Sequence, residues 1–222
     1  VFNLYPFQAL LYLPSANLVR PDADGLPAHI LQKATLATIQ PYNIPLTPGL
    51  TRLFELIEWL APKNIEAKFK APKAKNPTPL AQLLADKTTK PVVEAHIFRH
   101  LDLFLGELVR RNLPLTLDAE KKTLAKDVLI HIATSELIPY LSFHKTPEGI
   151  EYRLQLGTET ERWNIREQAL IPLTNTDPTW LLVGHTLFKV PGINGNMVKP
   201  FQQKDVLQIP LDKERLYFRQ FI

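Results

Sequence analysis

The stretch PVVEAHIFRHLDLFLGELVRR, residues 91–111, predicts the longest helix of the chain. At 100° per residue its large apolar side chains share one wide face, with charged side chains opposite. The apolar face consists of Val93, Ile97, Leu101, Phe104, Leu105 and Leu108. Arg110 and Arg111 suit the negative end of the helix dipole, and Pro114 prevents the helix from continuing.

The residues before this helix predict further helices. Thr47 can cap a helix over residues 47–60, because Pro48 then takes the first helical position, where its missing N–H costs nothing. The same start signal recurs at Pro62 and Pro79 and predicts two shorter helices.

Strand patterns dominate from residue 113 onward. Residues 150–156 alternate between apolar and polar after a Pro- and Gly-containing turn at 146–149, which predicts a hairpin. Residues 180–190 predict a second hairpin, and a last helix is expected from Asp212. Two short strands are also expected near the start of the chain, around a turn at residues 14–17.

These patterns predict an α+β protein with a helical N-terminal half and an antiparallel β-rich C-terminal half that ends in a helix. The expected subdomains are residues 1–112, mainly helical with short N-terminal strands, and residues 113–222, antiparallel and β-rich.

Composition narrows the class of protein. The 222 residues are 45% apolar and include no Cys, which excludes a disulfide framework, a thiolate zinc site and a cysteine nucleophile. The absence of Cys is typical of a reducing compartment, and the apolar runs are too short to span a bilayer. We therefore expect a cytoplasmic protein without a membrane partner.

Positive charge is concentrated in one segment. The chain carries 26 basic and 22 acidic side chains, a net charge of +4. Between Pro62 and Lys75 there are five basic side chains and a single acidic one, Glu66: they are Lys63, Lys68, Lys70, Lys73 and Lys75. This segment is either a solvated connector or a contact for nucleic-acid phosphates. Phe69 is its only aromatic residue, so the sequence does not predict a stacking platform.

The chain contains partial matches to the motifs of common catalytic and metal sites, but their residues do not have the spacing or context that those sites need. Gly192 and Gly195 are not followed by the Lys and Ser or Thr of a phosphate-binding loop. The Ser-x-x-Lys pair at Ser142 lies in a strand pattern, where positions three apart face opposite sides. His96 and His100 stand one helical turn apart, but two imidazoles make an incomplete metal site. We predict no catalytic, cofactor-binding or metal-binding residue.

The ends of the chain suggest a piece of a longer polypeptide. The sequence begins at Val1 and stops on bulky apolar residues after an amphipathic stretch. We expect the apolar side chains of this terminus to dock on a neighbouring segment: Leu216, Phe218, Phe221 and Ile222.

Four segments of the C-terminal half carry a family resemblance: LSFHKTPEGIEYRLQL (141–156), PTWLLVGHTLFKV (178–190), INGNMVKPF (193–201) and IPLDKERLYFRQFI (209–222). In this order they resemble the region that precedes the motor in large bacterial SWI/SNF-type helicase-like ATPases, particularly the long versions of Bacteroidetes. The stretch ATLATIQPYNIPLT (34–47) is similar to an earlier part of that region. The resemblance implies a DNA-associated parent motor whose two RecA-like lobes bind ATP and Mg²⁺. None of the motor's catalytic motifs matches a position here, so no cofactor is expected in this chain.

Three hypotheses follow. The first is a non-catalytic accessory domain that docks on the ATPase lobes of the same polypeptide and assists binding of double-stranded DNA through the five lysines. The second is a protein-interaction scaffold with no nucleic-acid role. The third is a stand-alone enzyme of an unrecognised type.

Overall fold

The structure, a computed structural model, describes residues 1–8, 11–118, 129–167 and 169–219. The chain divides into two compact units, Val1–Ile132 and Ala133–Ile222. The first unit contains β1 (Phe2–Gln8), β2 (Leu11–Pro21), β3 (Pro27–Lys33), α1 (Leu36–Ile39), η1 (Gln40–Tyr42), α2 (Pro48–Trp59), α3 (Pro62–Lys68), α4 (Leu80–Ala85), α5 (Lys90–Arg111), β4 (Leu115–Leu117) and β5 (Leu129–Ile132). None of the described helices is long and apolar enough to cross a bilayer.

The first unit is built on a mixed sheet with the strand order β3-β2-β1-β4-β5. Strand β1 pairs antiparallel with β2 and parallel with β4, so that Leu4 lies opposite both Pro14 and Leu117. A buried side-chain hydrogen bond joins β1 to β4: the Thr116 hydroxyl donates to the Asn3 side-chain oxygen at 2.9 Å. Since both side chains are buried, this bond satisfies groups that water cannot reach.

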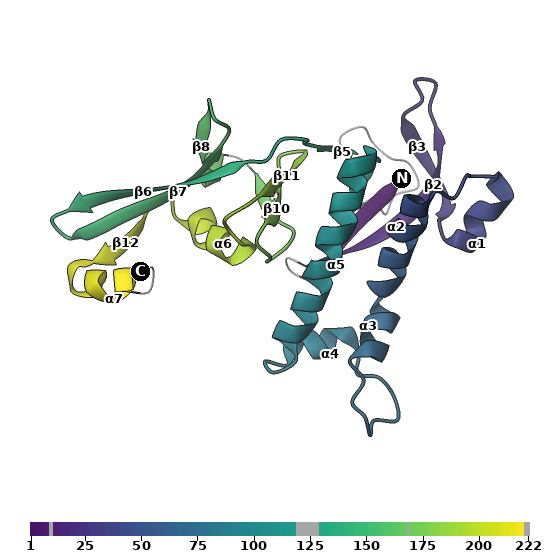
Figure 1. Ribbon diagram of the computed structural model, residues 1–222, viewed down its shortest axis with the longest axis horizontal. Helices are drawn as coiled ribbons and strands as arrows, with labels where there is room; N and C mark the ends of the chain where they lie inside the picture. Colours follow the sequence, from purple (N-terminus) through teal and green to yellow (C-terminus); the bar gives the residue numbers. More distant parts are fainter. Residues whose placement is uncertain (9–10, 119–128, 168, 220–222) are drawn as a thin grey trace. The chain divides into compact units, whose positions relative to one another are not determined.

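Helices α2 and α5 lie side by side against this sheet (Figure 1). The Phe2 ring from β1 lies 6.2 Å from the Phe54 ring of α2 and 5.8 Å from the Phe104 ring of α5. All three rings are buried, so the first strand anchors both helices through aromatic contacts.

The two helices run antiparallel, so the start of α2 lies next to the end of α5. Gly49, in the first turn of α2, lies against the Arg111 guanidinium at the end of α5, where a Cβ atom would clash. The Arg111 side chain in turn pairs with the buried Glu107 carboxylate at 3.4 Å. The Thr47 hydroxyl accepts from the Leu50 amide, which confirms the predicted cap of α2.

The second unit contains β6 (Ile138–Thr146), β7 (Gly149–Gly157), β8 (Arg162–Asn164), η3 (Ile165–Glu167), β9 (Leu170–Pro172), β10 (Thr179–Val183), β11 (Thr186–Val190), α6 (Gly195–Gln203), β12 (Leu207–Pro210), η4 (Leu211–Lys213) and α7 (Glu214–Arg219). Strands β6 and β7 form the first predicted hairpin, and β10 and β11 form the second, so both are confirmed. Gly149 begins β7 at φ 144°, where a Cβ atom would also meet the Ile209 carbonyl of β12.

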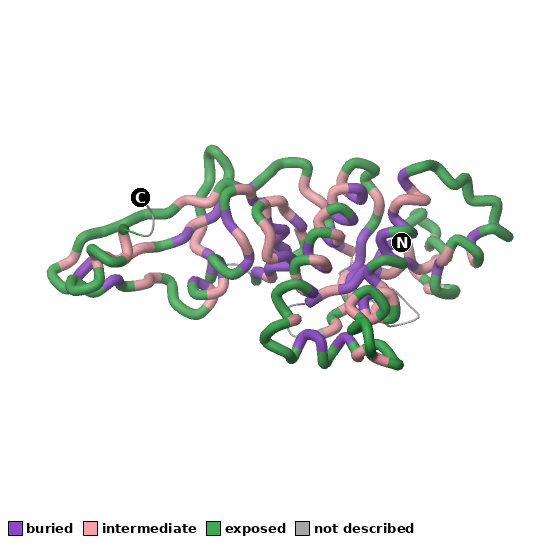
Figure 2. The backbone as a smooth tube through the Cα atoms, turned by 60° about the horizontal axis from the view of Figure 1, so that its bottom comes forward, coloured by how far each residue is buried: buried purple, intermediate pink, exposed green. Residues whose placement is uncertain are grey.

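Burial differs between the two hairpins of this unit. Strand β10 is buried along its whole length, and its Leu181 packs in a core with Leu156, Ile193 and Val198. Strand β6 is exposed or half-buried at every position, which Figure 2 shows in green and pink. The apolar side chains of β6 therefore form a surface rather than a core.

The predicted α+β class with a helical first half is wrong. Strands β1 to β3 take up most of residues 2–33, β1 and β4 pair in parallel, and helix α6 lies in the second unit. The fold is mixed α/β, because β4 follows the helices and returns to the strand that precedes them. The predicted turn at residues 14–17 is also wrong: β2 continues through it, because residues 13–16 pair with residues 2–5 of β1.

We expect Phe104→Ala to lower the free energy of unfolding by about 3–5 kcal/mol, since the ring is 0% exposed and contacts Phe2. Leu103→Ala is the matched control on the same helix, because Leu103 is 41% exposed and should change stability by about 0.5 kcal/mol or less. Urea denaturation measures both. Equal losses for the two variants would contradict the anchoring role of Phe104.

Candidate nucleic-acid interface

Four of the five predicted lysines lie at the end of α3 and in the loop that follows it. Lys68 ends α3, and Lys70, Lys73 and Lys75 belong to residues 69–79, between α3 and α4. In Figure 1 this loop projects beyond the end of the helices. The Glu66 carboxylate accepts from the Leu80 amide at 2.8 Å, and this bond fixes the two ends of the loop.

These four lysines have no acidic partner among the residues that the structure describes. Within the part of the chain that the structure describes, no carboxylate lies within 4.0 Å of their ammonium groups. The Lys70 ammonium donates to the Lys75 carbonyl at 3.1 Å, which keeps its charge. The loop therefore presents uncompensated positive charge to solvent, which is the condition for attracting a polyanion.

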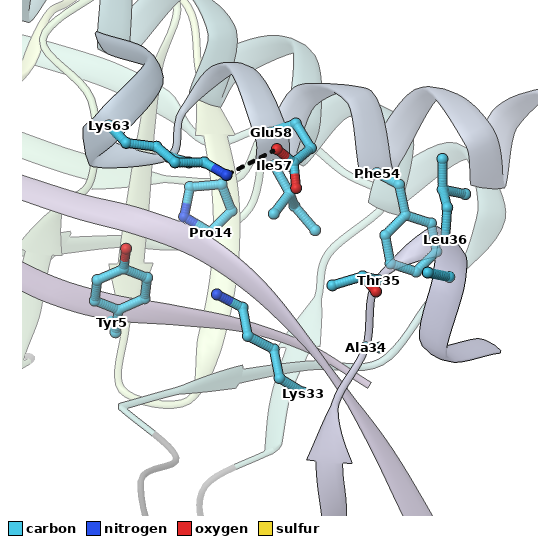
Figure 3. Close-up of a pocket in the computed structure, with 12 residues that line it drawn as sticks. Tyr5, Pro14, Lys33, Ala34, Thr35, Leu36, Phe54, Ile57, Glu58 and Lys63 are labelled. Carbon is cyan, nitrogen blue, oxygen red and sulfur yellow. Dashed lines mark ion pairs between the residues drawn. The ribbon is translucent and has the colours of Figure 1, made fainter. Parts of the chain in front are cut away.

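Lys63, the fifth lysine, has different surroundings. Its ammonium lies 4.0 Å from the Glu58 carboxylate, and both side chains are exposed, so the pair is weak. Figure 3 shows Lys63 and Lys33 directed into one cavity of about 550 Å³, with the side chains of Phe54 and Ile57 on its walls. Lys63 is therefore separated from the loop lysines and partly neutralised.

Four rings come together beside Lys68. The ring centroids of Trp59 and His100 lie 5.4 Å apart, those of His100 and His96 4.2 Å, and those of His96 and Phe69 5.6 Å. We call Trp59, Phe69, His96 and His100 the ring cluster. Phe69 does not stand alone, as the sequence had suggested, because α2 and α5 bring the other three rings to it.

Two arginines add charge around the ring cluster. The Arg52 guanidinium carbon lies 4.6 Å from the centroid of the Trp59 ring, a cation–π geometry, and it also pairs with Glu55 at 3.1 Å. Arg99 is exposed on α5 and has no ion-pair partner among the described residues. Spacing along the sequence brings only His96 and His100 together, because Trp59 lies on α2 and Phe69 directly follows α3.

The two histidines differ in their surroundings. The His100 Nδ1 atom lies 2.7 Å from the His96 carbonyl oxygen, so Nδ1 carries the hydrogen and donates it. Burial, reinforced by His100, Lys68 and Arg99, lowers the pKa of His96 to about 4. Among the described residues, no group of three or more His, Asp or Glu side chains is arranged to hold a metal ion.

The predicted docking residues lie in the second unit. Leu216 on α7 is 65% exposed, whereas the Phe218 ring lies 6.0 Å from the Phe143 ring of β6. Phe221 and Ile222 lie outside the described residues.

Apolar side chains of β6, β7, α6 and α7 line a groove of about 530 Å³, including Leu141, Phe143, Tyr152, Met197, Phe201 and Phe218. Burial and a hydrogen bond to Tyr217 raise the pKa of the Tyr152 hydroxyl.

Comparisons with protein-family models, with curated proteins and with solved structures gave no match to this chain. What the ring cluster with the loop lysines and the apolar groove can bind is therefore inferred from their own geometry.

We expect the His96 ring to titrate near pH 4 rather than near 6.5. The unfolded chain then binds a proton between pH 6.5 and about 4 that the folded chain does not, so the free energy of unfolding falls as the pH drops through this window. His96→Gln should remove that part of the pH dependence. A ring titration followed by NMR measures the pKa directly, and a midpoint near 6.5 would contradict the effect that partial burial has on His96.

Proposed function

We propose that this chain is a cytoplasmic, non-catalytic accessory domain that binds nucleic acid beside the ATPase lobes of the SWI/SNF-type motor it resembles. The observation that carries the nucleic-acid part is the group formed by Lys68, Lys70, Lys73 and Lys75, which have no acidic partner among the described residues. Lys68 also lines a cavity together with Arg99. In this proposal ATP and Mg²⁺ are bound by the motor lobes, and this chain contacts the nucleic acid.

Binding through this loop acts on phosphates rather than on base edges. Lysine side chains that neutralise phosphates release condensed counterions, so the affinity falls steeply with salt and depends little on sequence. Because Pro72, Pro77 and Pro79 restrict the backbone of the loop, its ammonium groups lose less freedom on binding than those of a flexible tail would.

The test compares two variants that remove the same charge. The loop variant changes Lys68, Lys70, Lys73 and Lys75 to Gln, and the control changes the exposed Lys87, Lys145, Lys204 and Lys213 to Gln. We expect the loop variant to lose about tenfold or more in affinity for a labelled DNA duplex at low salt. Its plot of log affinity against log salt should flatten by up to about 0.9 per lost phosphate contact.

Fluorescence anisotropy at several salt concentrations makes this measurement. Lys63→Gln should change the affinity less than any loop lysine does, because Lys63 already faces Glu58. Equal effects of the loop and control variants would leave only a net-charge effect, and the proposed interface would then be wrong.

The apolar groove of the second unit favours a second function, protein docking without a nucleic-acid role. Leu141, Phe143 and Met197 line it and are all exposed, an arrangement that is common where a partner binds. In this alternative the partner is an apolar segment of the ATPase lobes.

A docking groove must be open in the isolated chain. We expect a hydrophobic dye such as ANS to bind the chain and to lose most of its fluorescence when Leu141 and Phe143 are both changed to Ser. The exposed pair Leu31 and Leu36 of the first unit, changed to Ser in the same way, provides the control. Unchanged dye fluorescence in the groove variant would argue against an open groove.

A further inference from the structure

We propose that the ring cluster binds an unpaired nucleobase, so that the preferred ligand is a single-stranded nucleic acid rather than a duplex. This inference rests on the proposed function, since it names the form of nucleic acid that Lys68 and the loop of residues 69–79, here called the basic loop, would hold.

The ring cluster has the composition of a stacking site. Trp59 is 45% exposed, at the solvent end of a row of rings that continues through His100 and His96 to Phe69. Aromatic side chains stack on nucleobases with little dependence on sequence, because each base has a π-face. The Trp59 indole is already held by an edge-to-face contact with His100 and by the Arg52 guanidinium over its ring, so it loses little freedom when a base binds to it.

A cavity with cationic walls adjoins Trp59. It measures about 550 Å³, within the range of about 300–1,000 Å³ that small-molecule sites span. The cations on its walls are Arg52, Lys68 and Arg99, and the exposed Val92 and Leu103 add apolar surface. Apolar and aromatic walls suit a base, and a cationic rim suits the phosphates on either side of it.

Lys68 connects this cavity to the basic loop. It lines the cavity and also stands at the end of α3, where the loop with the other three lysines begins. A nucleic-acid strand that lies along the loop lysines thus reaches the rings while its phosphates stay next to positively charged side chains. The lowered pKa of His96 keeps its imidazole uncharged at neutral pH, so this ring offers a π-face there and not a fourth cation.

A duplex does not satisfy this arrangement. Its bases are stacked on one another, and a base reaches a ring in a cavity only after it has left the stack, which costs a few kcal/mol. In an unpaired strand this cost does not arise, because its bases need not first be removed from a duplex. The phosphates of both forms can contact the loop lysines, so the rings and not the lysines would discriminate between them.

The experiment measures the affinity of the full chain for four labelled ligands of equal length. These are oligo-dT, oligo-U, an abasic DNA strand and a DNA duplex, and the protein variants are Trp59→Ala and Trp59→Leu. We expect the wild-type chain to bind oligo-dT or oligo-U at least about fivefold more tightly than the abasic strand, the lower end of what stacking one base contributes. Both variants should lose this preference and retain their affinity for the duplex.

Tyr42→Ala is the matched control, because Tyr42 is 52% exposed in the same unit and does not line the cavity. Its affinities should equal those of the wild type. Trp59→Leu keeps apolar bulk at the position, so a loss shared by both Trp59 variants reports the missing ring rather than a disturbed helix. The oligo-dT and oligo-U arms show whether DNA or RNA is preferred.

The outcomes separate the two proposals. If no ligand binds, or if the four-lysine loop variant binds all of them as the wild type does, the proposed function is wrong. If the duplex and the abasic strand bind as tightly as oligo-dT and oligo-U, and the Trp59 variants change nothing, the stacking inference is wrong while phosphate binding stands.

Discussion

The position of the Phe2 ring is the constraint on which the first unit depends. Its contacts with Phe54 of α2 and Phe104 of α5 fix both helices against the strand that pairs with β2 and β4. Burial of three aromatic rings at one point opposes sliding of either helix along the other, because close-packed cores tolerate small displacements poorly. The antiparallel α2–α5 pair is therefore a rigid frame.

That frame produces the candidate interface. The end of α2 carries Trp59, the middle of α5 carries His96 and His100, and α3 delivers Phe69 and Lys68 to the same place. Among the described helices, none alone carries all of these side chains. These side chains meet because Phe2 fixes α2 and α5 against β1 and because α3 follows α2 directly, which relates a buried contact at Phe2 to an exposed surface.

Local features of the sequence predicted the elements well. Thr47 and Pro48 located the start of α2, the apolar stripe located α5, and the alternation at residues 150–156 located a hairpin. The sequence could not predict that Phe2 lies opposite Leu115 in a parallel pair, because nothing local encodes a partner more than a hundred residues away. The prediction of the fold class was wrong for this reason. The lysines could be predicted as a group because they lie in one segment of the sequence. The four rings lie on α2, on α5 and directly after α3, and only tertiary packing brings all four together.

The most direct test of this account is an NMR map of the amide and side-chain signals that shift when the ¹⁵N-labelled chain is titrated with oligo-dT. The shifts should fall on the Trp59 indole, on His96 and His100, and on the loop residues 69–79. The groove around Phe143 in the second unit should stay unchanged. Shifts confined to Ala133–Ile222, with the Trp59 indole signal unmoved at saturation, would contradict the proposed interface.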